Sequence, residues 1–266
     1  WRALIADDGE LPAEIRVEII SKDEAPMLAA ETGGGFKPFH VYNTALKIAS
    51  PSMTTVIGGA VDDLTAAENS RSKDAVFFPD AYARLQESYQ GADQILITHE
   101  HFDHVMAITR HPAPETFAAK LKLTAEQIDA LPAFGPEGGL SPILRDLPPA
   151  DFPKPMRIAP GIVIAPAPGH TPGSHVFYIR RADGAEYVLV GDIVWAVSNI
   201  AHLKTRPRLL QFLFFKPPED RAAVLDQVRA LHDLAAREPG LIFISEHDGD
   251  NVEKLIDNGS LVLGFE

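Results

Sequence analysis

The stretch THEHFDH, residues 98–104, places three histidines and one aspartate directly after the apolar run QILI. The chain has only ten histidines in 266 residues, so a cluster of three calls for a chemical reason. Imidazole and carboxylate groups bind metal ions, and α/β folds commonly hold such groups on loops beyond strand ends. We therefore expect a metal-binding loop. His99 and His101 are expected to point to one side of it, and Asp103 and His104 to another.

Three later segments repeat this arrangement of a strand followed by polar side chains. They are GIVIAPAPGH (161–170), AEYVLVGD (185–192) and LIFISEH (241–247). With the first loop they present seven candidate ligands: His99, His101, Asp103, His104, His170, Asp192 and His247. One catalytic zinc takes three or four protein ligands, so this number predicts two divalent metal ions. We expect zinc, with iron or manganese as alternatives, because all three accept imidazole and carboxylate ligands.

The composition excludes several classes of site and partner. The sequence has no cysteine, which excludes disulfides, iron–sulfur clusters, thiolate zinc sites and a cysteine nucleophile. Lys and Arg number 24 against 37 Asp and Glu, and the formal charge of −13 argues against nucleic acid and anionic membranes as ligands. No run reaches the roughly 18 apolar residues of a membrane span. We therefore expect a small-molecule substrate.

The cellular compartment is left open by the sequence. The printed chain begins with Trp1 instead of methionine, and an export signal removed upstream would explain this. The absence of cysteine also fits an exported, periplasmic protein. We favour export over a cytoplasmic location.

The remaining pattern predicts an α/β protein. Strands are expected at 14–20, 40–50, 53–59, 94–98, 161–170, 174–181, 185–192 and 241–245, and helices at 79–90 and 217–240. Residues 111–157 differ in being rich in Pro and Gly, with a capping box from Thr124 to Gln127. We interpret the chain, residues 1–266, as one domain with a cap or rim insertion at about 111–157; a plain connector is the alternative there.

At these residues the chain resembles the metallo-β-lactamase superfamily. HEHFDH, PGHTPGS, a Gly-Asp pair and a late strand followed by histidine occur in the family's order, over about residues 40–250. The resemblance implies a four-layer αβ/βα sandwich with the site at one edge of two β-sheets. It assigns His99, His101 and His170 to a first metal, and Asp103, His104 and His247 to a second. It makes Asp192 the bridge between the two metals.

Such a pair of metals implies a binuclear metallo-hydrolase. A shared hydroxide would attack an ester, thioester, lactone or β-lactam carbonyl, and Asp103 or Asp192 would pass the proton. Two alternatives remain open. One is an iron-dependent oxidoreductase or persulfide dioxygenase on the same fold, and the other is a non-catalytic metal-binding protein.

Two departures from the family pattern affect the expected site. Gly58 and Gly59 stand where many members have Asp-Thr-Gly; Asp62 or Asp63 is a candidate substitute for that aspartate, although we favour a surface turn. Trp195 stands where quorum-signal lactonases of the family have a tyrosine, and an indole has only its nitrogen as a donor. We therefore expect acyl-homoserine lactones to be poor substrates.

Other residues have a structural and a functional interpretation. We expect structural roles for the five remaining histidines, His40, His111, His175, His202 and His232. Phe134, Trp195, Phe212, Phe214 and Phe215 either form an acyl pocket or, as we favour, belong to the core or an interface. Lys204 and Arg206 are candidate partners of a substrate carboxylate. If the segment LLQFLFF (209–215) is exposed, it predicts a homodimer.

Overall fold

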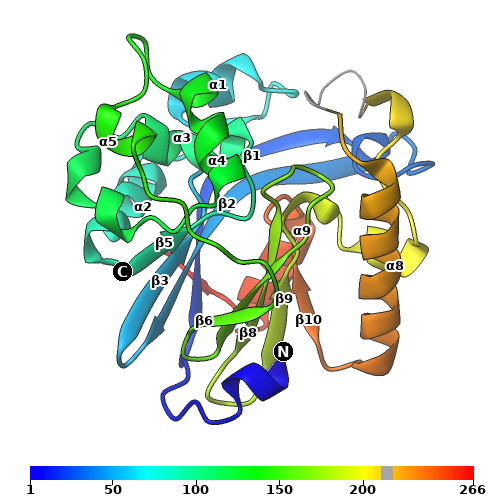
Figure 1. Ribbon diagram of the computed structural model, residues 1–266. Coiled ribbons are helices and arrows are strands. Elements are labelled where there is room, and N and C mark those ends of the chain that lie inside the picture. The colour runs from blue at the N-terminus through cyan, green and yellow to red at the C-terminus, as the bar shows by residue number, and fades with distance from the viewer. Residues whose placement is uncertain (211–217) are drawn as a thin grey trace.

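Two β-sheets form the centre of the computed structural model, which describes residues 1–210 and 218–266 (Figure 1). The first sheet has the order β11-β1-β2-β3-β5, with β4 paired to β1, and the second has the order β10-β9-β8-β7-β6. The strands of the first are β1 (Ile15–Pro26), β2 (Pro38–Ser50), β3 (Met53–Ile57), β4 (Val76–Phe77), β5 (Gln94–Leu96) and β11 (Val262–Leu263). Those of the second are β6 (Met156–Ala159), β7 (Ile162–Pro166), β8 (His175–Arg180), β9 (Glu186–Leu189) and β10 (Ile242–Ile244).

Helices cover the outer faces of the two sheets (Figure 1). On the side of the first sheet lie α1 (Asp63–Glu68), α2 (Pro79–Gly91), α3 (Phe102–Thr109), α4 (Ala125–Ala130) and α5 (Pro142–Arg145). On the side of the second lie α6 (Ser198–His202) and α8 (Arg221–Arg237), while α9 (Gly249–Asp257) packs beside β2. Short 3₁₀ turns occur at Arg2–Ile5, Met27–Ala29, Pro114–Thr116, Ala118–Lys120, Leu131–Phe134 and Gly191–Ile193. The expected four-layer αβ/βα sandwich is confirmed.

Three of the apolar clusters among the described residues hold the layers together. Leu46 of β2 and Phe177 of β8 belong to the cluster between the sheets, and both are fully buried. Leu85 of α2 packs in a second cluster beneath the helices of the first sheet, and Val224 of α8 in a third against the second sheet. Alternation along the strands therefore supplies both faces of each sheet with buried side chains.

The segment 111–157 consists of short helices and turns before β6. Leu131 and Leu144 in it are fully buried in the same cluster as Leu85, so it packs onto the helical layer of the first sheet. Gln127 Oε1 accepts the backbone N–H of Thr124 at 3.1 Å, as expected for a capping box. The division into one domain with an inserted cap or rim stays a prediction.

The strand ends that precede the candidate ligands meet at one edge of the sandwich. β5 runs parallel to β3, and β10 parallel to β9. The backbone N–H of His175 donates to Thr98 O at 2.8 Å, which ties the loop after β5 to the start of β8 in the other sheet. Residues separated by more than 140 positions in the sequence, such as Thr98 and Glu246, are hydrogen-bonded there.

Among the described residues, no helix is both long and apolar enough to cross a membrane. Of the segment 209–215, residues 211–215 lie outside the described part of the chain, including Phe212, Phe214 and Phe215. The homodimer expected from that segment therefore stays a prediction.

Candidate metal centre

The seven candidate ligands gather in two groups at this edge of the sandwich. The first group is His99, His101, His170 and Asp192, and the second group is Asp103, His104 and His247. Within each group, one potential ligand atom from each residue lies within 4.8 Å of the others. His101 and Asp103 are half-buried and the other five are buried. The structure thus brings together all seven residues that the sequence pattern singled out.

Asp192 lies between the two groups. Its Oδ2 is 3.8 Å from His99 Nε2 and 3.4 Å from His170 Nε2. Its Oδ1 is 3.7 Å from His104 Nε2 and 3.2 Å from His247 Nε2. Each carboxylate oxygen therefore faces one group, which is the arrangement that a bridging ligand requires.

Hydrogen bonds to residues outside the two groups fix the tautomers of two histidines. His170 Nδ1 lies 2.6 Å from Glu219 Oε1, and His247 Nδ1 lies 2.7 Å from Tyr42 O. Because a carboxylate and a carbonyl oxygen only accept, each Nδ1 carries the hydrogen and each Nε2 keeps a lone pair. These lone pairs point inward: His170 Nε2 is 2.9 Å from His101 Nδ1.

The donor set fits two metal ions. His104 Nε2 and His247 Nε2 lie 3.2 Å apart, although imidazole nitrogens with lone pairs do not attract one another. Within the described residues, the buried atoms His99 Nε2 and Asp192 Oδ1 have no hydrogen-bond partner. Buried polar atoms without partners cost about 1–3 kcal/mol each. A cation at each group would satisfy these atoms, and their nitrogen and oxygen donors suit zinc, iron or manganese.

The pKa values of the two groups show where positive charge is favoured. Burial and the neighbouring imidazoles lower the pKa of His101 to about 3, which keeps this ring in its neutral, ligating form. Burial also lowers the pKa of His104, but the carboxylates of Glu246 and Asp103 outweigh it and raise that pKa to about 10. Carboxylates around the second group therefore favour a positive charge, which a proton or a metal cation supplies.

Glu246 and Thr98 support the ligands from beneath. Thr98 Oγ1 donates to Glu246 Oε2 at 2.6 Å, and Glu246 Oε2 lies 3.6 Å from His104 Nδ1. Thr98 Oγ1 is also 3.3 Å from Nδ1 of both His99 and His104. The sequence reasoning missed Glu246. The sequence signal for Glu246 is its position directly after the apolar strand LIFIS. In the structure this carboxylate is fully buried, so it needs a hydrogen-bond partner.

Glu219 and Arg206 support the first group. Arg206 pairs with Glu219 through Nη2, which also donates to Asp192 O at 2.7 Å. Arg206 is only 3% exposed, and Lys204 Nζ binds Glu31 Oε1 at 3.0 Å. Both cations pair with carboxylates of the chain itself, so the structure gives no support to the candidate role of binding a substrate carboxylate. The sequence predicts that Glu219 lies within the helix 217–240, but Asp220 caps α8, which begins at Arg221, and Glu219 is buried before it.

Asp62 does not replace the missing family aspartate. Its Oδ1 accepts from Thr65 N at 2.9 Å and caps α1, while Oδ2 pairs with Arg110 Nη1 at 2.6 Å. At Asp62 the structure thus shows a half-buried helix N-cap instead of the surface turn favoured from the sequence. Gly59 contributes in another way, because a Cβ there would lie 2.2 Å from His104 O. The glycine allows the end of β3 to pass close to the backbone of α3.

The five remaining histidines, Phe134 and Trp195 are not members of the two groups. The histidines have their own hydrogen bonds: His40 with Asp250, His111 with Ala113 N, His175 with Gly173 O, His202 with Glu31, and His232 with Ile200 O. Their expected structural roles are confirmed. Phe134 packs against the helical core cluster. Trp195 lies at the site, where Nε1 donates to Asp192 Oδ2 at 2.6 Å.

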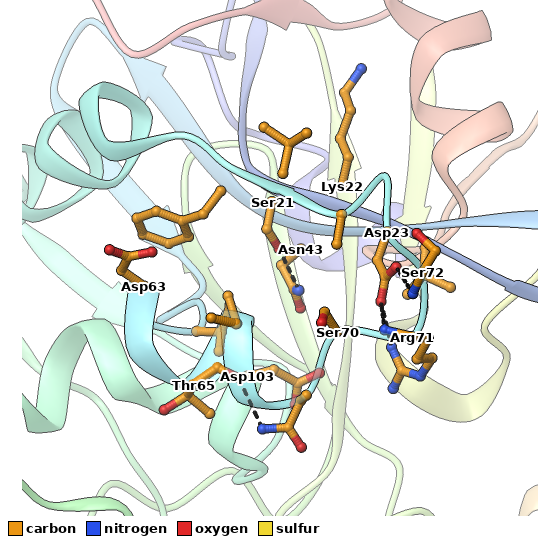
Figure 2. Close-up of a pocket in the computed structure, with 18 of the residues that line it drawn as sticks. Ser21, Lys22, Asp23, Asn43, Asp63, Thr65, Ser70, Arg71, Ser72 and Asp103 are labelled. Atoms are coloured by element: carbon orange, nitrogen blue, oxygen red, sulfur yellow. Dashed lines mark hydrogen bonds and ion pairs between the residues drawn. The ribbon is translucent and has the colours of Figure 1, made fainter.

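A cavity of about 400 Å³ adjoins the second group (Figure 2). Asp103, His247 and Trp195 line one part of it, and β1, β2 and the loop 69–75 line the rest. Of the aromatic residues considered for an acyl pocket from the sequence, Trp195 lines this cavity, and Phe212, Phe214 and Phe215 lie outside the described residues. A substrate in this cavity has access to the second group.

Comparisons with known proteins agree on the fold. The sequence matches no protein-family model and no curated protein. Similar solved structures include an N-acyl homoserine lactone hydrolase with N-hexanoyl-L-homoserine bound at its catalytic metal center, with 12% identity, 92% of this chain and 96% of that chain covered, and TM-score 0.65. Another is a probable metal-dependent hydrolase from Staphylococcus aureus, with 14% identity, 89% and 90% coverage and TM-score 0.64. The dizinc quorum-quenching lactonase AidC has 14% identity, 91% and 92% coverage and TM-score 0.54. The chain thus has the metallo-β-lactamase type of fold.

Proposed function

We propose that this chain is a binuclear metal-dependent hydrolase of the metallo-β-lactamase superfamily. The observation that carries the proposal is the position of Asp192, whose two oxygens face two separate groups of inward-pointing donors. The similar structures support it, since those described above are named as lactone hydrolases or as a probable metal-dependent hydrolase. A purely structural metal site would have no need of an adjoining cavity.

The two groups supply the ligand sets. His99, His101 and His170 would hold one metal, Asp103, His104 and His247 the other, and Asp192 would bridge them. Zinc is our first choice of metal, because borderline imidazole and carboxylate ligands in these numbers suit it. Four of the histidines have a hydrogen-bond partner at Nδ1: His99, His104, His170 and His247. These contacts hold the rings in position, as is usual for metal-binding histidines.

The reaction is the addition of water to an acyl carbon. When bound, two metals of this kind lower the pKa of water and stabilise negative charge on a carbonyl oxygen. Water adds to the carbonyl carbon, the bond to the leaving oxygen, sulfur or nitrogen breaks, and the leaving atom receives a proton. Asp103 is the proposed proton carrier, because its side chain is 18% exposed and lines the cavity, whereas that of Asp192 is 3% exposed.

Substrates with an open ester or thioester fit this site better than acyl-homoserine lactones. The family tyrosine that polarises a lactone carbonyl is replaced by Trp195, and its one donor is engaged with Asp192. A homoserine lactone carbonyl would therefore lack the donor that the tyrosine supplies in the similar lactonases.

Metal analysis together with a substrate panel tests the proposal. We expect about two metals per chain and hydrolysis of a phenyl ester or a thioester that is lost on chelation and restored by zinc. The panel also contains a lactone, a β-lactam and glutathione persulfide. Stoichiometric iron with oxygen uptake on the persulfide would instead indicate the oxidoreductase, and two bound metals without turnover of any substrate would indicate a metal-binding protein.

A further inference from the structure

The cavity beside the second group has a cationic wall. The loop 69–75 between α1 and β4 contributes Arg71 and Lys73 to its lining. Lys22 also lines it, but Lys22 Nζ binds Glu253 Oε1 at 2.9 Å. Asp23, Asp63 and Asp103 also line the cavity, so its three cations balance its three carboxylates in a chain whose formal charge is −13.

Asp23 of β1 holds this loop in place. Its Oδ2 accepts the backbone N–H of Arg71 at 2.7 Å, and its Oδ1 accepts that of Ser72 at 3.0 Å (Figure 2). Its Oδ1 also accepts from Glu24 N at 2.7 Å. The carboxylate is therefore largely occupied by backbone donors, and it fixes the position of Arg71 on the wall.

The guanidinium of Arg71 has spare donors. Its contact with Asp23 Oδ2 is a distant 3.8 Å ion pair, and it donates no hydrogen bond to any residue in the described parts of the chain. Its side chain is 42% exposed. A guanidinium presents a planar set of N–H donors that matches a carboxylate in a bidentate fashion. Arg71 is thus able to bind an anion that enters the cavity.

Two further polar atoms of the lining lack partners. Ser72 Oγ and Asn43 Oδ1 are buried, and neither finds a hydrogen-bond partner among residues 1–210 and 218–266. Asn43 Nδ2 is used, since it donates to Ser21 Oγ at 2.8 Å. Buried polar atoms are nearly always satisfied in proteins, so unpaired ones in a cavity lining indicate where a ligand makes contact. Ser72 can donate to such a ligand and Asn43 can accept from it.

The cationic wall adjoins the metal centre. The Arg71 guanidinium lies 5.7 Å from the centre of the Trp195 ring, and Trp195 Nε1 binds Asp192. The same cavity is lined by Asp103 and His247 of the second group. A single small molecule can therefore reach both the Arg71 side chain and the groups that would hold the metals.

We propose that the substrate is a carboxylate-bearing acyl ester or thioester, and that Arg71 binds its carboxylate. This inference rests on the proposed hydrolase function and specifies its substrate class. Arg71 determines the preference for an anion, with Lys73 adding positive charge at the same wall. Ser72 and Asn43 bind a polar group between the carboxylate and the scissile carbonyl.

Matched esters test the proposal. Phenyl hexanoate and monophenyl adipate have six-carbon acyl chains that differ by a terminal carboxylate. In the metal-replete protein we expect kcat/KM to be at least about 10-fold higher for the adipate. Arg71→Met should lower this ratio by roughly 10- to 150-fold, because a hydrogen bond to a charged group contributes about 1.5–3 kcal/mol. Arg229→Met is the control, since Arg229 lies on the exposed face of α8 and pairs with Asp226; the ratio should not change.

Binding of the uncleaved anilides separates this inference from the proposed function. Hydrolysis of both esters at equal kcat/KM would overturn the anion site and leave the hydrolase standing. If neither ester is hydrolysed, the proposed function fails, and calorimetry with hexananilide and adipic acid monoanilide then decides the anion site. The anion site is supported if the wild type binds the anionic anilide more tightly and Arg71→Met abolishes this preference. Equal affinities, or a preference that Arg71→Met leaves intact, would contradict it.

Discussion

The indole Nε1 of Trp195 donates a hydrogen bond of 2.6 Å to Oδ2 of Asp192, the carboxylate that lies between the two groups of candidate ligands. The Trp195 ring is also 5.5 Å from the ring of His247. This contact orients the Asp192 carboxylate, while Arg206 Nη2 donates to the Asp192 backbone oxygen at 2.7 Å. The indole therefore contacts the candidate metal ligands Asp192 and His247, and its only donor is not available to a substrate carbonyl.

Replacement of Asp192 should remove metal and activity together. We expect Asp192→Ala to lose at least one of two metals per chain and most hydrolysis, because one carboxylate faces both groups. Elemental analysis of the folded variant measures this. A variant that keeps two tightly bound metals would show that Asp192 is not the bridge.

Asp62→Ala is the matched control for Asp192. It should keep both metals but lower the free energy of unfolding by about 0.5–2 kcal/mol, since it removes a helix cap. Burial raises the pKa of Asp62, but the bonds from Thr65 and the Arg110 guanidinium outweigh it and hold that pKa below its usual value. A depressed pKa stabilises the fold above the unfolded-state value of about 3.9 and less at lower pH. The difference from wild type in urea unfolding should therefore shrink as the pH falls below about 4.

Removal of the charge at Glu219 should weaken metal binding by the first group and leave that by the second group unchanged. Glu219 holds the hydrogen of His170 on Nδ1, so Glu219→Gln should lower the affinity for one of the two metals by roughly 10- to 100-fold. Competition with a chromophoric chelator measures this, and circular dichroism checks that the variant is folded. Glu238→Gln, at an exposed pair with Arg2, should not alter the chelator curve. An unaltered curve for folded Glu219→Gln would mean that His170 is oriented without this carboxylate.

A methyl group at Gly59 should displace α3, the helix that carries Asp103 and His104. A Cβ there would lie 2.2 Å from His104 O, which is a backbone atom and cannot rotate away. We expect Gly59→Ala to destabilise the protein by about 1–3 kcal/mol and to impair metal binding by the second group. Gly91→Ala, at the end of α2 with open space around the new methyl, should be neutral or slightly stabilising. Similar melting temperatures for the two variants would refute the close approach of β3 and α3.

Lactone hydrolysis should be slow relative to ester hydrolysis. We expect a lower kcat/KM for N-hexanoyl homoserine lactone than for phenyl hexanoate, since loss of one oxyanion donor typically costs about 10²- to 10³-fold. Trp195→Tyr should narrow the gap by supplying a hydroxyl, whereas Trp1→Tyr, at the other tryptophan, should not. Equal rates on lactone and ester in the wild type, unaffected by Trp195→Tyr, would show that position 195 does not face the carbonyl.

The sequence by itself determined the candidate ligands and the class of fold. His99, His101, Asp103 and His104 are recognisable because their spacing is local and follows an apolar strand, and the same strand-then-ligand pattern marks His170, Asp192 and His247. The strand and helix segments predicted an α/β protein, and the resemblance carried by the motifs implied the four-layer sandwich. These patterns are visible in the sequence because they depend on the spacing of residues that lie within a few positions of one another.

Only the tertiary structure decided which side chains act on those ligands. Glu219 and Glu246 reach His170 and Thr98 across gaps of 49 and 148 positions, and no local pattern relates them. Arg206 and Arg71 are both arginines in loops, yet one is buried in an ion pair and the other lines the cavity. Their roles depend on where the folded backbone places each guanidinium relative to carboxylates elsewhere in the chain, because burial and pairing are properties of three-dimensional contacts and not of residue type.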